Sequence, residues 1–405
     1  MSETCKVAVK INDDYCGKCT ICYSICPFQA ITRNEETGEV KIEIEKCQVC
    51  GLCSSACPVS AIEMAYYDVD ELTGYAERKM NELESENLVL TCRGSSPESC
   101  ELVEILQKLD IRDFVPLRLP CVGRVPTEFI FKMLAKGVKK IVAIRCEEDF
   151  CRFKKGSKTN SQRLLLAKTI LAQLGFKEDT LTVLEASKKA EYDTEKCVGC
   201  DKCTFICPYG AIEAKPWATP EINFEVCQGC GACALVCPHL AIQLKGFEYD
   251  SITQQIKNQI AKIKALKPKN GRPAILVFCC PWAEFTALDD FRDASLPENV
   301  VLTEIPCSKG LDPVHVVQAF NLGFEGVLAV TCAKEDCKLE EGKEIAERNI
   351  AALEKVLQKL RLSDRFEHCT TSPRYPDDFN IKLESFIKKI TNLQKASKKP
   401  TLPVR

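Results

Sequence analysis

Several features are missing from this chain of 405 residues, and each absence removes a class of function. Neither charge predominates, with 55 basic and 57 acidic residues, so nothing favours binding to nucleic acid or to an anionic membrane surface. The N-terminus lacks the apolar core of a signal peptide. The longest apolar run, AILVFCCPWA, is far too short to cross a bilayer. We therefore expect a soluble, cytoplasmic protein.

Motifs for nucleotides and for catalysis are missing as well. No G-x-G-x-x-G follows an expected strand and no G-x-x-x-x-G-K-[ST] occurs, so a nucleotide or dinucleotide site is not indicated. Any flavin is expected on another chain. The paired cysteine motifs that hold a nickel–iron site are also absent. The sequence therefore predicts no catalytic residue.

Cysteine is the residue that stands out. The chain has 28 cysteines and only 3 histidines. In a small secreted protein such a count would indicate disulfides. This chain is long, carries no export signal and places most of its cysteines in tight C-x-x-C clusters. Thiolates that hold metal in a reducing compartment are the better account.

The chain contains two consecutive copies of a module of roughly 185 residues. Cys16 returns as Cys197 and Cys57 as Cys237, 181 and 180 positions later. Farther along, the matched residues are displaced by 186 positions. These residues are Cys121, Cys146, Cys151, Gly137 and Gly156, repeated as Cys307, Cys332, Cys337, Gly323 and Gly342. Each module has a cysteine-dense front part and an α/β back part.

Each front part contains two runs of the form C-x2-C-x2-C-x3-C-P. This is the spacing of bacterial ferredoxins, in which three cysteines of one run hold a [4Fe–4S] cluster and the fourth ligates the neighbouring cluster. The runs come in pairs, as that exchange requires. The predicted ligand sets are Cys16, Cys19, Cys22 with Cys57; Cys47, Cys50, Cys53 with Cys26; Cys197, Cys200, Cys203 with Cys237; and Cys227, Cys230, Cys233 with Cys207.

Four cysteines can also hold structural zinc. Zinc sites usually come as two separated C-x-x-C pairs, however, and not as runs of four, so the pattern favours iron–sulfur clusters. All four predicted sets are complete, which leaves no iron open to a substrate. We therefore expect these four clusters to pass electrons and to do nothing else.

In the back parts, apolar β-branched runs alternate with amphipathic helical stretches. In the first copy, expected strands end at Cys92, Cys121 and Cys146, and an expected helix lies between Pro126 and Gly137. This alternation predicts a parallel sheet covered on both faces. The expected fold class is α+β and α/β, with two dicluster ferredoxin-like domains alternating with two parallel-sheet α/β modules.

The cysteines of the back parts fall at the C-terminal ends of expected strands, where open α/β sheets place their ligand sites. Both copies share the spacing C-x24-C-x4-C. Buried core cysteines are the alternative, but equivalent strand-end positions in both copies favour a site. The predicted sets are Cys92, Cys121, Cys146 and Cys151, and Cys280 (or Cys279), Cys307, Cys332 and Cys337.

The segments PCVGRVPTEF…CEEDFC and PCSKGLDPVH…CAKEDC, with CPW at Cys280, resemble the delta-subunit family of methyl-viologen-reducing hydrogenase. In that family the cysteines bind a [2Fe–2S] cluster. Its members join a hydrogenase or formate dehydrogenase to the flavin subunit of heterodisulfide reductase, where electron bifurcation occurs. The resemblance covers roughly residues 85–190 and 270–390. It implies one [2Fe–2S] cluster in each back part.

The chain departs from the family at the first ligand. Family members commonly carry a further cysteine three residues later, where this chain has Ser95 and Ala283. Cys100 and Cys279 are alternative ligands for that place. In the second front part, His239 is either a hydrogen-bonding neighbour of a cluster or a packing residue.

These features predict five segments. They are a dicluster ferredoxin domain over 1–70, an α/β [2Fe–2S] module over 71–190, a second ferredoxin domain over 191–250, a second α/β module over 251–392, and a tail over 393–405. The amphipathic helix expected over 251–266 is predicted to pack on its own module.

The functional prediction is an electron-transfer subunit with four [4Fe–4S] and two [2Fe–2S] clusters. The expected partners are a flavoprotein related to the flavin subunit of heterodisulfide reductase and a hydrogenase, formate dehydrogenase or other oxidoreductase subunit, in a larger complex of an anaerobe. Two alternatives stay open. One is an enzyme that reduces thiols or sulfur compounds at an open strand-end site, and the other is a scaffold that stores or delivers clusters.

Overall fold

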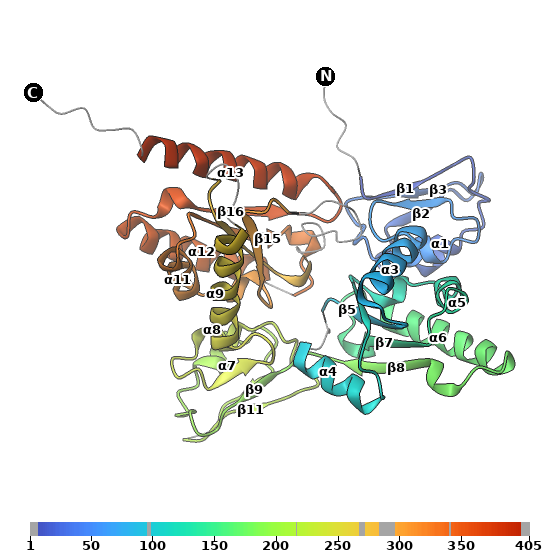
Figure 1. The fold of residues 1–405 in the computed structure, drawn as a ribbon, viewed down its shortest axis with the longest axis horizontal. Coiled ribbons are helices and arrows are strands. Elements are labelled where there is room, and N and C mark those ends of the chain that lie inside the picture. Colours follow the sequence, from blue (N-terminus) through green and yellow to red (C-terminus); the bar gives the residue numbers. More distant parts are fainter. Residues whose placement is uncertain are drawn as a thin grey trace, which may run out of the picture. The chain divides into compact units, whose positions relative to one another are not determined.

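The computed structural model describes residues 7–94, 99–215, 217–266, 272–282, 296–339 and 342–397. The chain forms two compact units. The first is built from residues 1–188, and the second from the remainder apart from two short segments that group with the first. Each unit contains one front part and one back part of the repeat (Figure 1).

Both front parts consist of two short antiparallel ladders and two helices of one turn or slightly more, as the small apolar segments after each cysteine run predict. Unit 1 has β1 (Val9–Ile11) paired with β4 (Ile62–Met64), β2 (Ile31–Arg33) paired with β3 (Val40–Ile42), and the helices α1 (Ile21–Ile25) and α2 (Leu52–Ser55). Unit 2 has β9 (Ala190–Tyr192) paired with β12 (Ile242–Leu244), β10 (Ile212–Glu213) paired with β11 (Glu221–Ile222), and the helices α7 (Lys202–Ile206) and α8 (Ala232–Val236).

The back part of unit 1 is a four-stranded parallel sheet in the order β6-β5-β7-β8. Its central strand β5 has five consecutive buried residues, as expected of a strand covered on both faces. The elements are α3 (Val69–Leu83), β5 (Asn87–Cys92), α4 (Ser99–Lys108), β6 (Val115–Leu119), α5 (Thr127–Ala135), β7 (Lys140–Cys146), α6 (Gly156–Gln173) and β8 (Leu181–Ala186). Three strands therefore lead directly to predicted ligand cysteines.

The back part of unit 2 repeats this topology in the order β14-β13-β15-β16, again all parallel. The elements are α9 (Tyr249–Leu266), β13 (Ile275–Cys279), β14 (Val300–Glu304), α11 (Pro313–Leu322), β15 (Gly326–Cys332), α12 (Gly342–Lys359), β16 (Phe366–Thr371) and α13 (Asp378–Ser397). Figure 1 shows α13 running along β16. The two parallel sheets and the small antiparallel ladders confirm the expected fold class.

The helix α9 packs on its own module, as its isoleucine stripe predicts. Ile252, Ile256, Ile260 and Ile263 are all buried in one core with α11, α12 and the strands β13 and β15. On the other face of the sheet, Gly326 lies so close to Ile390 and Phe386 of α13 that an added Cβ would approach them to about 3 Å. The sheet is therefore covered on both sides.

At the C-terminus, α13 extends to Ser397, into the segment expected as a tail, and residues 398–405 lie outside the described residues. No helix in the described part of the chain is long and apolar enough to span a membrane.

Candidate iron-sulfur centres

The four cysteine runs of the front parts share one backbone conformation. Each run has positive φ at three matching places: just before its second cysteine, just after its second cysteine, and three residues after its fourth. Such left-handed residues turn successive N–H groups toward the concave side of a loop, which creates a binding place for anions. The residues are Lys18, Thr20 and Gln29; Val49, Gly51 and Ser60; Gly199, Asp201 and Gly210; and Gly229, Gly231 and Leu240.

The fourth cysteine of every run accepts a backbone hydrogen bond from the residue four positions later. Such bonds stabilise the anionic sulfur that an iron ligand must supply. The donors are the N–H groups of Ala30, Ala61, Ala211 and Ala241, which lie 3.4, 3.2, 3.4 and 3.2 Å from the sulfurs of Cys26, Cys57, Cys207 and Cys237. All four crossing cysteines are thus held in the same way.

The fourth cysteine lies with the three cysteines of the neighbouring run. One cavity is lined by Cys26 together with Cys47, Cys50 and Cys53. A second is lined by Cys237 together with Cys197, Cys200 and Cys203. Among the described residues, no three cysteine, histidine or acidic side chains converge closely enough to share one metal ion. The thiols instead surround cavities, an arrangement that fits clusters held by four cysteines.

In the two other predicted sets, the influence of one thiol on the pKa of another shows which cysteines lie close together. Burial raises the pKa of the Cys233 thiol, and the neighbouring Cys230, Cys227 and Cys207 raise it further, so Cys207 lies near the second run. In the first run, Cys16 and Cys19 have the same effect on the pKa of Cys22, although burial is the larger cause. For Cys57, the predicted fourth ligand of this set, the structure gives the hydrogen bond from the N–H of Ala61.

Within each front part the two runs differ in exposure. Cys19 and Cys200, from the first run of each pair, are exposed. Their counterparts in the second runs, Cys50 and Cys230, are buried, and burial raises the pKa of Cys50 to about 12. We call the first-run sites the outer sites and the second-run sites the inner sites.

In the back part of unit 1, the parallel sheet brings together the four predicted thiols. Cys92 ends β5, Cys146 ends β7, and Cys121 and Cys151 follow β6 and β7 in short turns. Bonds from the thiols of Cys121 and Cys146 lower the pKa of Cys92, and Cys121 likewise lowers that of Cys151 to about 7. Cys92 also accepts the N–H of Val122 (3.2 Å). The thiols therefore form one contiguous group.

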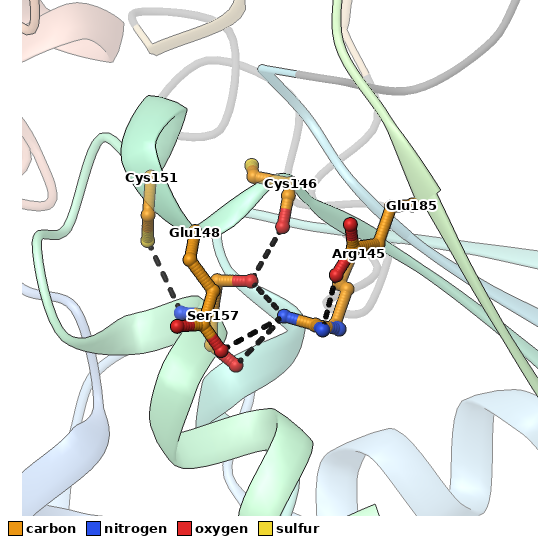
Figure 2. Close-up of polar contacts among 6 residues, drawn as sticks. All are labelled: Arg145, Cys146, Glu148, Cys151, Ser157 and Glu185. Atoms are coloured by element: carbon orange, nitrogen blue, oxygen red, sulfur yellow. Dashed lines mark hydrogen bonds and ion pairs between the residues drawn. The ribbon is translucent and has the colours of Figure 1, made fainter.

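Ser157 links the end of β7 to the turn that follows this strand in the strand-end site (Figure 2). Its N–H donates to the sulfur of Cys151 (3.2 Å) and its hydroxyl donates to the carbonyl of Cys146. Arg145 donates to the Ser157 hydroxyl (2.5 Å) and pairs with Glu185. Because Ser157 lies in the first turn of α6, the helix dipole also favours a negative sulfur at Cys151.

Unit 2 brings together the corresponding thiols. The sulfurs of Cys280 and Cys332 lie 3.3 Å apart. Cys307 is near both Cys280 and Cys337, and burial together with these neighbours raises its pKa. The neighbouring Cys279 is the last residue of β13 and is fully buried. The geometry therefore favours Cys280 over Cys279 at this place.

The structure does not describe the side chains at three other positions discussed for the first ligand. Ser95 and Ala283 are outside the described residues, and the side chain of Cys100 is not described, although its backbone belongs to α4.

Each strand-end site includes a glycine whose position has no room for a Cβ atom. A Cβ added to Gly156 would stand 2.6 Å from the sulfur of Cys121 and 3.3 Å from that of Cys151. A Cβ on Gly342 would stand 2.9 Å from Cys337 and 3.2 Å from Cys307. Contacts below 3 Å force a shift of the backbone or the thiol. The repeat of these glycines at the cysteine offset is the sequence signal of their role.

In both units the inner site adjoins the strand-end site of the same unit. In unit 2, Cys230 packs in one buried cluster with Cys307 and Leu339. In unit 1, Arg163 donates to the hydroxyl of Ser55, two residues after the inner-site ligand Cys53 (2.8 Å), and to the carbonyl of Gly123, two residues after the strand-end ligand Cys121 (2.7 Å). Electron carriers at these sites would be neighbours.

A different buried cation stands at each junction. In unit 2 it is Lys309, which is fully buried, lies 5.4 Å from the ring centre of Tyr209, and has no hydrogen-bond partner for its Nζ among the described residues. In unit 1, Arg124 lies against Gly51 of the inner loop and donates to the carbonyl of Tyr66 (2.6 Å). The sequence pattern gave no signal for these cations.

Comparison with known proteins identifies the back parts. Residues 88–198 and 275–394, together more than half of the chain, match the family model of the methyl-viologen-reducing hydrogenase delta subunit. The chain belongs to this family. Residues 15–61 and 196–241 match the 4Fe-4S dicluster domain, so the front parts of this delta-subunit family member are [4Fe–4S] domains, as predicted.

The relatives come from two kinds of complex. One is a subunit of the ferredoxin/F(420)H(2)-dependent CoB-CoM heterodisulfide reductase of Methanosarcina acetivorans. It is 31% identical over 207 residues, a match that covers 50% of this chain and 25% of that protein. Another is the iron-sulfur subunit of the vhc F420-non-reducing hydrogenase of Methanococcus voltae. It is 26% identical over 125 residues, which covers 30% of this chain and 87% of that protein.

The iron-sulfur subunit of the F420-non-reducing hydrogenase from Archaeoglobus profundus is 32% identical over 90 residues, covering 22% of this chain and 66% of that protein. The chain matches only a quarter of the length of the heterodisulfide reductase subunits. It is thus an iron–sulfur protein homologous to these hydrogenase and heterodisulfide reductase subunits, and its relatives belong to oxidoreductase complexes.

Proposed function

We propose that this protein carries electrons between an oxidoreductase and a flavin-containing, electron-bifurcating complex of the heterodisulfide reductase type, in the cytoplasm of an anaerobe. The proposed partners are a flavoprotein related to the flavin subunit of heterodisulfide reductase and a hydrogenase, formate dehydrogenase or other oxidoreductase subunit. Relatives from both kinds of complex support this proposal. The flavin belongs to the partner and not to this chain.

The proposed cofactors are four [4Fe–4S] clusters at the outer and inner sites and two [2Fe–2S] clusters at the strand-end sites. Their ligands are the cysteine sets predicted from the sequence, with Cys280 as the first ligand in unit 2 because its sulfur lies 3.3 Å from that of Cys332. We also propose that the ferredoxin domains and the α/β modules alternate with boundaries at residues 70, 190 and 250.

The packing of Cys230 against Cys307 carries the proposal. A bound cluster supplies reversible one-electron storage. The residues of the chain hold the sulfurs in place, donate N–H groups to them, and exclude water with apolar side chains such as Leu339 and Ala232. Because the inner and strand-end ligands share one buried cluster of residues, an electron at one site is close to the other.

The exposed cysteines indicate where electrons pass to and from the protein. Cys19 and Cys200 reach the surface in the outer sites, whereas every inner and strand-end cysteine is buried or half-buried. Within each unit the order of carriers is therefore outer site, inner site, strand-end site. This order allows flow in either direction.

Anaerobically purified full-length protein tests the relay. The full set of clusters predicts about 20 iron atoms per chain. Electron paramagnetic resonance during a redox titration should show every cluster reduced reversibly. Cys151→Ser and Cys337→Ser should each remove one strand-end signal, and Cys369→Ser, a buried cysteine of β16 outside the predicted sets, should remove none.

Other outcomes would overturn the relay. A measured content of about 16 iron atoms per chain would show that the strand-end clusters are absent. Turnover of a disulfide or sulfur compound by the purified chain, lost in Cys337→Ser, would make it an enzyme. Transfer of clusters to an apo-acceptor would make it a scaffold. Native anaerobic purification with identification of the accompanying chains tests the proposed partners.

A further inference from the structure

The side chain of Tyr192 reaches a predicted cluster ligand. Tyr192 is the last residue of β9, and its hydroxyl lies 3.0 Å from the sulfur of Cys203 in the outer site of unit 2. Both residues line the cavity that is surrounded by Cys197, Cys200 and Cys237. The phenol is therefore placed against a sulfur that faces the cluster position.

The direction of this hydrogen bond follows from the chemistry of the ligand. A cysteine that binds iron is a thiolate and has no proton to give, so the Tyr192 hydroxyl must donate. A donor to a ligand sulfur stabilises the cluster more when it carries the extra electron, because the charge on the sulfur is then larger. Such a bond raises the reduction potential of the cluster.

Unit 1 contains a matched position without the donor. Ile11 ends β1 and stands opposite Ile62 of β4, just as Tyr192 stands opposite Ile242 of β12. Because the register is the same in both ladders, the two side chains occupy equivalent places. An isoleucine cannot donate a hydrogen bond. The two outer sites therefore differ by one bond to sulfur.

A second residue of the same cavity differs in the same sense. His239 lines the outer cavity of unit 2, and the place two residues after the fourth cysteine is taken in unit 1 by Val59. At both of these matched positions the outer site of unit 2 has a polar side chain where unit 1 has an apolar one.

We propose that Tyr192 holds the outer cluster of unit 2 at a higher reduction potential than the outer cluster of unit 1. The two copies of the module are then not equivalent, because the outer cluster of the second copy exchanges electrons at a higher reduction potential. This inference rests on the proposed electron-transfer function and assigns Tyr192 as a positioning residue for it.

A redox titration of the full-length anaerobic protein, followed by electron paramagnetic resonance, tests the inference. Tyr192→Phe removes only the hydroxyl. It should lower the midpoint potential of one [4Fe–4S] cluster, changing its reduced-to-oxidised ratio severalfold, where tenfold equals about 59 mV for one electron. Tyr15→Phe, an exposed tyrosine beside Cys16, should leave all potentials unchanged. Unchanged potentials in Tyr192→Phe would overturn the inference.

The reciprocal variant keeps the test decisive if Tyr192→Phe loses iron. Ile11→Tyr places a phenol at the matched position and should raise the potential of one [4Fe–4S] cluster. If it retains iron and no potential rises, the inference is wrong. Failure of the inference is distinct from failure of the relay, since reversible reduction of all clusters with potentials insensitive to both variants would leave the relay intact.

Discussion

A Cβ built on Gly156 would stand 2.6 Å from the sulfur of Cys121. The first turn of α6 thus lies directly against a predicted cluster ligand, and the equivalent turn of α12, at Gly342, lies against Cys337 and Cys307. We predict that Gly156→Ala displaces the thiol and costs the protein one strand-end cluster, about two iron atoms per chain. Iron analysis and the visible spectrum measure the loss.

A matched glycine supplies the control for that prediction. Gly74→Ala lies inside α3, where the nearest atom to an added Cβ is the flexible end of Arg78 at 3.7 Å. It should retain all iron and add slight helix stability. Full iron content in Gly156→Ala would show that the contact is not essential.

The adjacent cysteines of unit 2 should behave differently. Cys280→Ser removes a sulfur that lies 3.3 Å from that of Cys332, and it should abolish the strand-end signal of unit 2. Cys279→Ser, at the buried end of β13, should keep the cluster and cost about 1–3 kcal/mol of stability through a buried hydroxyl. If Cys279→Ser instead lost the cluster while Cys280→Ser kept it, the ligand assignment would be reversed.

Lys309 places a fully buried ammonium beside the strand-end site of unit 2. A nearby positive charge favours the reduced, more negative form of a cluster. Lys309→Met keeps the aliphatic stem, so we expect a lower midpoint potential at that site without loss of stability. Redox titration provides the measurement, and Lys262→Met on the exposed side of α9 is the control. Identical potentials in all three proteins would exclude this role.

We predict that His315 makes the stability of the protein depend on pH. Its Nε2 lies 3.2 Å from the carbonyl of Tyr249 and its ring stacks on the Tyr249 ring at 4.6 Å. Burial lowers its pKa below 6.5, partly offset by the charge of Asp312. As pH falls below 6.5, the unfolded chain binds a proton that the folded chain refuses. Stability should therefore fall by at most about 1.4 kcal/mol per pH unit.

The first copy supplies the variant that tests this pH dependence. The residue equivalent to His315 is the fully buried Phe129. His315→Phe should have a thermal midpoint that changes less between pH 7.5 and pH 5.5 than that of the unmodified protein. Parallel curves for the two proteins would mean that His315 does not contribute.

Much of the fold was predictable because the determining signals are local. The apolar runs before Cys92 and Cys146 predict strands that end at those cysteines, and the structure has β5 and β7 end there. Similarly, the isoleucine spacing of 251–266 predicts a helix packed on its own module, which α9 confirms. Period and composition suffice where one element buries one face.

The sequence by itself determined that the chain is a duplicated iron–sulfur protein, because cluster ligands are held in short runs whose spacing is set by the cofactor. Only the tertiary structure decided which sites are outer and inner, that Cys280 meets Cys332, and that Tyr192 meets Cys203. These relations depend on strand register and on packing between distant segments. Neither is encoded in the spacing of neighbouring residues, since a one-residue change in register turns a side chain to the opposite face.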